Sequence, residues 1–193
     1  LPLPHRHIMF GHAYKGQASG RVLLDRFVAG GGALYDLEYL VDEAGRRVAA
    51  FGYWAGYAGA AVSLLAWMAQ RDGGICPPEH TYASATAMRD ALAAGLGTDS
   101  PNALIIGALG RVGTGGADLY EALGMPVTKW DMAETASGGP FPEVLEHDIF
   151  LNCILARDGT PVFVPLSAKT AERRLSVVGD IACDPQSDFS PIK

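Results

Sequence analysis

Cysteine is scarce in this sequence, and the few cysteines follow no recognisable pattern. Cys76, Cys153 and Cys183 are far apart and form no Cys-x-x-Cys or Cys/His spacing. This spacing excludes the common zinc motifs and offers no disulfide framework. Reduced thiols in a cytoplasmic protein are therefore expected, and the first residues show none of the features of a secretory signal.

Positive charge is also in short supply. The chain has 15 Lys and Arg against 21 Asp and Glu, for a net charge of −6, and both signs are spread along it. A nucleic-acid partner would require a clustered basic surface, so none is expected. A metal site is not expected either, because His5, His7 and His12 have no carboxylate or cysteine near them at ligand spacing.

Charge is absent altogether from residues 48–70, VAAFGYWAGYAGAAVSLLAWMAQ. The segment is long enough to span a bilayer, and Gly52 and Gly56 have the GxxxG spacing of paired membrane helices. However, much of it is glycine and alanine, and its first residues resemble the end of a strand. We therefore predict a buried helix over about 53–70 in an α/β protein, and no membrane partner.

Strand and helix patterns alternate along most of the chain. Residues 33–41 and 48–52 suggest two strands around a tight turn at Gly45, and residues 84–96 have helical spacing. Further strands are predicted within ALIIG, VTKWDM, DIFLNCI and RLSVVGDIACD, with a helix in GADLYEALG. This alternation predicts an α/β fold with a Rossmann-like, doubly wound parallel sheet.

The most informative motif is the turn GALGRVG at residues 107–113. Gly110 fits the place where a backbone approaches a pyrophosphate, and Gly113 fits the place where helix packs on strand. Ala108 stands where a first glycine is usual, with Gly107 just before it. The helix that follows would point its N-terminal amides at phosphate groups, and Arg111 could add a charged contact.

An acidic residue lies about 20 residues beyond this turn. Asp131 ends the next predicted strand, where a carboxylate accepts hydrogen bonds from ribose hydroxyls and repels a 2′-phosphate. Strand, turn, helix and acid together predict a dinucleotide site that favours NAD over NADP. The alternative is a glycine-rich turn that binds nothing, with Asp131 as a solvated carboxylate.

Several long motifs resemble one enzyme family. The segments are YDLEYL, GRRVAAFGYWAGYAGAA, IIGALGRVGTGGADL, KWDMAETASGGPFPE and DIFLNCI. Together they resemble the NAD-dependent, lysine-forming saccharopine dehydrogenases of the alanine dehydrogenase-like group, over about residues 5–184. The resemblance implies two Rossmann-like domains. Residues 1–51 would be the second half of the substrate domain, and residues 52–193 the NAD-binding domain with a linking helix.

The family activity implies a set of catalytic residues. These enzymes oxidise saccharopine with NAD and water to lysine and 2-oxoglutarate, through an imine that is hydrolysed, as part of lysine metabolism. By this resemblance, His12 matches the family's acid–base histidine and Lys15 matches a lysine of the active site. Glu38 matches a carboxylate that tunes the pKa values of the site. A histidine titrating near neutrality suits both proton transfers that this chemistry needs.

The resemblance also implies binding residues. Arg47 would contact a substrate carboxylate with help from Arg46, and Gln17 and Phe51 would lie nearby. The cofactor residues implied by the turn and by the match form one set: Gly107, Gly110, Arg111, Gly113, Asp131 and Thr135.

The sequence also departs from the family pattern. The family's Lys-Glu catalytic pair is absent, and so is its closing segment, so an internal fragment that is inactive alone is expected. Val112 stands where some relatives have a cysteine able to face Cys153. Two alternatives stay open: a related amino-acid dehydrogenase of the alanine dehydrogenase group, and a catalytically inactive NAD-binding module. The intact enzyme is expected to be a monomer.

Overall fold

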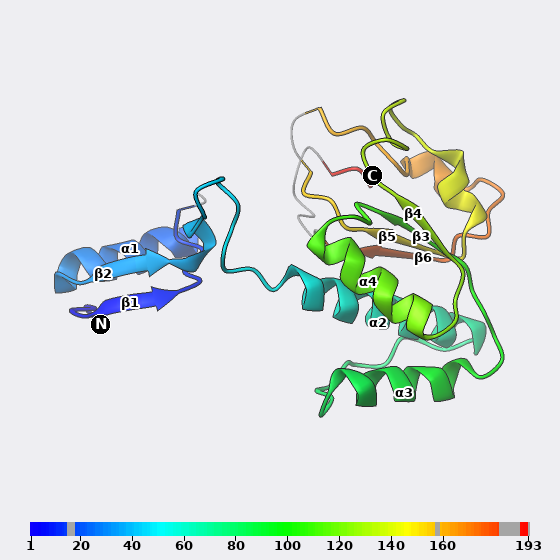
Figure 1. Cartoon of the computed structure of the whole chain (residues 1–193), viewed down its shortest axis with the longest axis horizontal. Coiled ribbons are helices and arrows are strands. Elements are labelled where there is room, and N and C mark those ends of the chain that lie inside the picture. The colour runs from blue at the N-terminus through cyan, green and yellow to red at the C-terminus, as the bar shows by residue number, and fades with distance from the viewer. Residues whose placement is uncertain (15–17, 157–158, 182–189, 193) are drawn as a thin grey trace. The chain divides into compact units, whose positions relative to one another are not determined.

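The computed structural model divides the chain into two compact units, Leu1–Phe51 and Gly52–Lys193. Figure 1 colours the chain from blue at the N-terminus to red at the C-terminus. The structure describes residues 1–14, 18–156, 159–181 and 190–192. Each unit has its own parallel sheet, and the predicted α/β class is confirmed.

The smaller unit is built on a single strand–helix–strand motif. Strands β1 (Arg6–Met9) and β2 (Ala33–Asp36) pair in parallel, with helix α1 (Ala18–Gly30) connecting them. The helix packs on one face of the pair, where the ring of His7 meets Phe27 edge-on with centroids 5.2 Å apart. Helix α1 lies in a stretch for which the sequence patterns predicted nothing.

The predicted strand over 33–41 is wrong beyond Asp36. There the Asp36 side chain accepts a hydrogen bond from the backbone N–H of Glu38, which starts the 3₁₀ helix η1 (Leu37–Tyr39). The predicted strand over 48–52 is also wrong, and one isolated antiparallel bridge, Val41 to Arg47, is described nearby. The tight turn at Gly45 is present, with φ of +75°.

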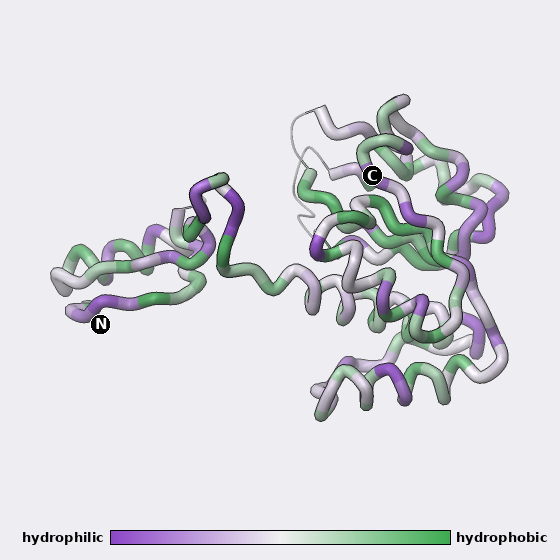
Figure 2. Tube along the Cα trace, in the orientation of Figure 1, coloured by the Kyte–Doolittle hydropathy of each residue, from purple (hydrophilic) through white to green (hydrophobic). Residues whose placement is uncertain are grey.

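The larger unit has a four-stranded sheet in the order β4-β3-β5-β6, with every strand parallel to its neighbours. The strands are β3 (Ala103–Ile106), β4 (Val127–Trp130), β5 (Ile149–Asn152) and β6 (Val177–Asp180). The central strands β3 and β5 are buried along their whole length, and apart from Asn152 at the end of β5 their residues are apolar, which Figure 2 shows in green. Such continuous apolar runs are typical of parallel strands covered on both faces.

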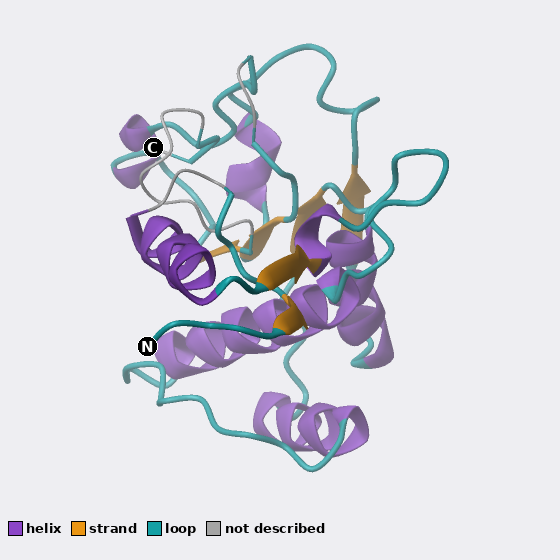
Figure 3. Ribbon diagram, turned by 90° about the vertical axis from the view of Figure 1, so that its left-hand side faces the viewer, coloured by secondary structure: helices purple, strands orange, loops and turns teal. Residues whose placement is uncertain are grey.

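Two separate cores cover the two faces of this sheet. Ile105 and Leu151 point into the core formed with α2 (Gly52–Arg71), α3 (Ala85–Leu96) and α4 (Arg111–Ala122). Leu104 and Phe150 point the other way, toward the 3₁₀ helices η2 (Pro142–Glu146) and η3 (Leu166–Lys169) and their loops. Figure 3 shows the long helices beside the strands. The sheet is thus doubly wound, with short 3₁₀ segments in place of α-helices on its second face.

Glycines bring α2 and α4 into close contact. A Cβ atom at Gly56 would overlap the backbone carbonyl of Val112, and one at Gly115 would overlap the carbonyl of Tyr53. Helix–helix packing in a core therefore explains the uncharged composition of residues 52–70, whereas Val48 and Phe51 before the helix are exposed. Within the described ranges, no helix combines the length and apolarity that a membrane crossing requires.

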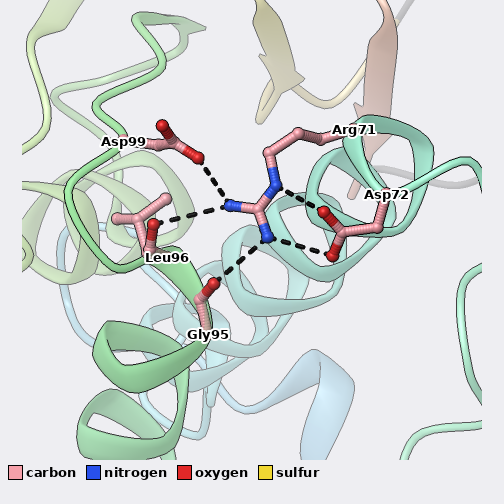
Figure 4. Close-up of polar contacts among 5 residues, drawn as sticks. All are labelled: Arg71, Asp72, Gly95, Leu96 and Asp99. Atoms are coloured by element: carbon pink, nitrogen blue, oxygen red, sulfur yellow. Dashed lines mark hydrogen bonds and ion pairs between the residues drawn. The ribbon is translucent and has the colours of Figure 1, made fainter.

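Arg71 ties the end of α2 to the end of α3 (Figure 4). Its guanidinium donates to the backbone carbonyls of Gly95 and Leu96, which are among the last of α3, and to the carboxylate of Asp99 at 2.7 Å. Asp72 binds the other edge of the guanidinium at 2.7 and 3.0 Å. The hydrogen bonds that Arg71 donates to Asp72 and Asp99 raise the pKa of its guanidinium above the ordinary value.

We expect Arg71→Met to lower the melting temperature of the protein by a few degrees. Methionine keeps much of the apolar stem but leaves the last carbonyls of α3 without these donors. Arg89→Met is the matched control, because Arg89 pairs with the adjacent exposed Asp90. Circular dichroism melting of both variants checks this, and equal melting temperatures would contradict a linking role for Arg71.

Candidate active site and cofactor site

His12 lies just beyond the carboxyl end of β1 in an unusual backbone conformation. Its φ is +49°, and it is the one non-glycine residue in the described part of the chain with positive φ. Such a conformation costs on the order of 1–3 kcal/mol and persists only where the surroundings hold it. Strain of this kind gathers at functional sites, which makes His12 a candidate on structural grounds as well.

Glu38 joins His12 to Arg47. The imidazole Nδ1 of His12 is 3.1 Å from Oε2 of Glu38, and Nη1 of Arg47 is 3.9 Å from Oε1 of the same carboxylate. The Glu38 side chain is only 10% exposed, whereas that of His12 is 56% exposed. The carboxyl ends of the parallel strands β1 and β2 lie at the same edge of their sheet. His12, which follows β1, and Glu38, in η1 directly after β2, are therefore close together. Three residues predicted for the site therefore form one cluster.

The other residues predicted for this site behave differently. Arg46 pairs with Asp42 across the Gly45 turn, with Nε and Oδ2 2.9 Å apart. Phe51 is 59% exposed and meets the ring of Phe10 edge-on. Lys15 and Gln17 lie outside the described residues.

Asp36 was missed by the sequence analysis. Its carboxylate is buried at the end of β2 and accepts hydrogen bonds from the backbone N–H groups of Gly11 at 3.1 Å and Glu38 at 3.0 Å. Burial opposes the charge, but the N–H groups of Glu38, Gly11 and Ala13 and the nearby His12 outweigh it and lower the pKa of Asp36. The sequence signal for this role of Asp36 is its place at the end of a predicted strand, two residues before Glu38.

The glycine-rich turn links β3 to α4 with the geometry that a dinucleotide site requires. Gly107 has φ of +85°, which suits the sharp turn. Gly113 lies against Gly107, because a Cβ there would overlap the Gly107 carbonyl. Gly110 is the N-cap of α4 and makes no side-chain cap hydrogen bond. Among the described residues, the nearest atom to a Cβ built at Gly110 is the Gly107 carbonyl oxygen, at 3.4 Å. Backbone amides at this helix end are thus placed for an anion, and Arg111 is exposed beside them.

Asp131 connects the end of β4 to this turn. Its Oδ2 accepts a hydrogen bond from the backbone N–H of Leu109 at 3.0 Å. The hydroxyl of Thr135 donates to the backbone carbonyl of Asp131 at 2.9 Å. The structure therefore gathers the residues predicted for the cofactor at the carboxyl edge of the sheet, and this donor and acceptor set fits a dinucleotide.

The described cysteines and the described His, Asp and Glu side chains are the groups from which a second centre could form. Within the described ranges, no three His, Cys, Asp or Glu side chains come together in a way that could hold a metal ion. Burial, with a smaller effect of Asp180, raises the pKa of the Cys153 thiol to about 12. Cys153 is thus a poor nucleophile, and Cys183 lies outside the described residues.

The larger unit is an α/β protein of the Rossmann-like kind found in dehydrogenases. No protein-family model matches the chain. Three similar proteins are each named saccharopine dehydrogenase (NAD(+), L-lysine-forming). The one from Yarrowia lipolytica is 43% identical over 205 residues, which covers 100% of this chain and 56% of that protein. The one from Schizosaccharomyces pombe is 45% identical over 204 residues, covering 99% and 55%. The one from Emericella nidulans is 44% identical over 206 residues, covering 100% and 55%.

The chain is thus related to the lysine-forming saccharopine dehydrogenases, and the resemblance seen in the sequence is confirmed. It spans about half the length of the curated relatives it matches. The alternative of a different amino-acid dehydrogenase is not favoured, because these relatives share one name.

Proposed function

We propose that this chain takes part in the NAD-dependent oxidation of saccharopine to lysine and 2-oxoglutarate. The observation that carries the proposal is the His12–Glu38 pair, with its 3.1 Å contact, in a chain whose relatives are named for this reaction. On this proposal, Leu1–Phe51 supplies part of the substrate site and Gly52–Lys193 the cofactor site. A cytoplasmic, monomeric enzyme is part of the same proposal.

The proton chemistry is assigned to His12. An ionised Glu38 has no proton to give, so Nδ1 of His12 donates to it and Nε2 is left for the substrate. Nε2 can then take a proton from the substrate amine and return one in the hydrolytic step. Glu38 keeps the ring in this tautomer and stabilises the imidazolium that forms.

Arg47 is assigned to a carboxylate of the substrate. It carries a side chain that is 46% exposed, and it lies 3.9 Å from Glu38, so a bound carboxylate would share its charge. Arg46 is assigned a minor role, because its charge is already paired with Asp42. Lys15, Gln17 and Phe51 remain candidates for the same substrate site.

The cofactor would supply the hydride acceptor. The uncapped N-terminus of α4, with Gly110 and Arg111, would hold the pyrophosphate. The Asp131 carboxylate would accept hydrogen bonds from the ribose hydroxyls, and its charge would oppose a 2′-phosphate. Gly107, Gly113 and Thr135 would shape and support this site.

We expect Asp131→Ala to weaken NADH binding about tenfold or more, since charge-assisted hydrogen bonds to the ribose are lost. Asp131→Asn keeps an acceptor for the N–H of Leu109 but removes the charge, so its preference for NADH over NADPH should fall. Asp90→Ala is the control, because Asp90 is exposed and pairs with Arg89. Isothermal titration calorimetry checks all three, and unchanged NADH affinity in Asp131→Ala would rule out this cofactor site.

A further inference from the structure

The Asp36 carboxylate touches both segments that carry the proposed proton chemistry. Its Oδ1 accepts from the N–H of Gly11, just before His12, and from the N–H of Glu38 itself. These two N–H groups lie 25 and 2 residues away in sequence, so one oxygen joins two distant parts of the chain. Within the described residues, the other oxygen, Oδ2, is fully buried and has no hydrogen-bond partner.

The backbone around His12 is also confined by close packing. A Cβ atom at Gly11 would come within 3.2 Å of Asp36 Oδ2 and 2.9 Å of the Leu34 side chain. From the other side, a Cβ atom at Gly20 of α1 would come within 2.8 Å of the Ala13 carbonyl oxygen. The residues on either side of His12 are thus both tightly packed: Gly11 against β2 and Ala13 against α1.

We infer that Asp36 is a positioning residue that holds His12 in its left-handed conformation and fixes Glu38 beside it. The inference rests on the proposed function, because it assigns Asp36 to the acid–base pair of that site. Asp36 contacts neither reacting group directly. Asp36 acts through the backbone N–H groups of Gly11 and Glu38, which set the positions of the His12 and Glu38 side chains.

Charge makes the aspartate better suited to this role than a neutral side chain. A carboxylate that accepts backbone N–H bonds makes shorter and stronger hydrogen bonds than an amide oxygen does. Burial makes the loss of this acceptor more costly, because a buried N–H group without a hydrogen-bond partner is not compensated by water. Among the described residues, charged groups near His12 are Asp36, Glu38 and, through Glu38, Arg47, while Lys15 lies outside the described residues.

Asp42 offers a matched control within the same unit. Its Oδ1 also accepts two backbone amides, from Ala44 at 3.0 Å and Arg46 at 2.8 Å, but these shape the Gly45 turn. An aspartate that serves only local folding should behave as Asp42 does. Substitutions at Asp36 and Asp42 therefore separate positioning of the His12–Glu38 pair from ordinary turn stabilisation.

The test compares the protein with Asp36→Asn, Asp36→Ala and Asp42→Ala by NMR of ¹⁵N-labelled samples. Two signals report on the site: the His12 Nδ1 resonance bonded to Glu38, and the backbone shifts that mark positive φ at His12. We expect Asp36→Ala to lose both signals and to speed amide exchange at Gly11 and Glu38 by about tenfold or more. Asp36→Asn should restore them in part, and Asp42→Ala should leave them unchanged.

The inference fails if Asp36→Ala keeps both His12 signals, or if Asp42→Ala disturbs them equally. Should Asp36→Ala not fold, Asp36→Asn decides, because unchanged His12 signals and Gly11 exchange in that variant would overturn the role. None of these signals requires substrate. A separate titration of the unsubstituted protein with saccharopine tests the proposed function, so the two can fail independently.

Discussion

Gly56→Ala is expected to destabilise the larger unit by about 3 kcal/mol or more, a large fraction of the stability of an ordinary domain. The added methyl group would overlap the carbonyl of Val112, which is backbone and cannot rotate away. Helices α2 and α4 would have to separate, and both contribute to the core on one face of the sheet. Urea unfolding followed by circular dichroism measures the loss.

Gly74→Ala is the control for this experiment. Gly74 lies three residues beyond the end of α2, and the nearest described atom to a Cβ built there is the Ala69 carbonyl oxygen, at 3.6 Å. This variant should unfold at nearly the same urea concentration as the original protein. Equal midpoints for Gly56→Ala and Gly74→Ala would show that the close approach of α2 to α4 adds little to stability.

His12→Gln is expected to lower the turnover of saccharopine by roughly 10²–10⁴-fold, with a smaller change in KM. Glutamine can still hydrogen-bond Glu38, but it cannot gain and release a proton near neutral pH. The measurement is saccharopine-dependent formation of NADH under steady-state conditions, over a range of pH. It is made on a chain completed with the Lys-Glu segment and the closing segment of the related enzymes, because these residues alone are expected to be inactive.

His80→Gln provides the comparison, since His80 is an exposed loop residue beside Glu79 and Tyr82. Its rate should match that of the unsubstituted enzyme. If His12→Gln also retained full turnover, the proton transfers would have to be assigned to another group, while the cofactor site at Asp131 would be unaffected.

The glycine-rich turn could be predicted because its requirements are local and steric. Gly107 needs positive φ, and Gly113 needs room for a carbonyl, and both demands follow from the strand–turn–helix order. Burial of β3 and β5 could likewise be predicted from apolar runs. The contact between Gly107 and Gly113 lies within one short motif, so the sequence alone indicates it.

The smaller unit was harder to predict because its shape depends on side chains that interact with distant backbone. Residues 33–41 look like one continuous strand, yet Asp36 binds the N–H of Glu38 and starts η1. The same carboxylate reaches the N–H of Gly11, 25 residues earlier. The positive φ of His12 results from such contacts, and no propensity of histidine predicts it at this position.

The position of α2 in the fold also has a consequence for synthesis on the ribosome. This helix, uncharged up to Arg71 in its last turn, packs against β6, and the Gln70 side chain donates to the Ser176 carbonyl across 106 residues of sequence. Gly59 of the helix lies close enough to Ile181 that a Cβ there would be 2.7 Å from its side chain. During translation, α2 leaves the exit tunnel long before these partners are made. Its apolar surface is therefore exposed on the nascent chain, which makes α2 a natural site for a chaperone to hold until β6 arrives.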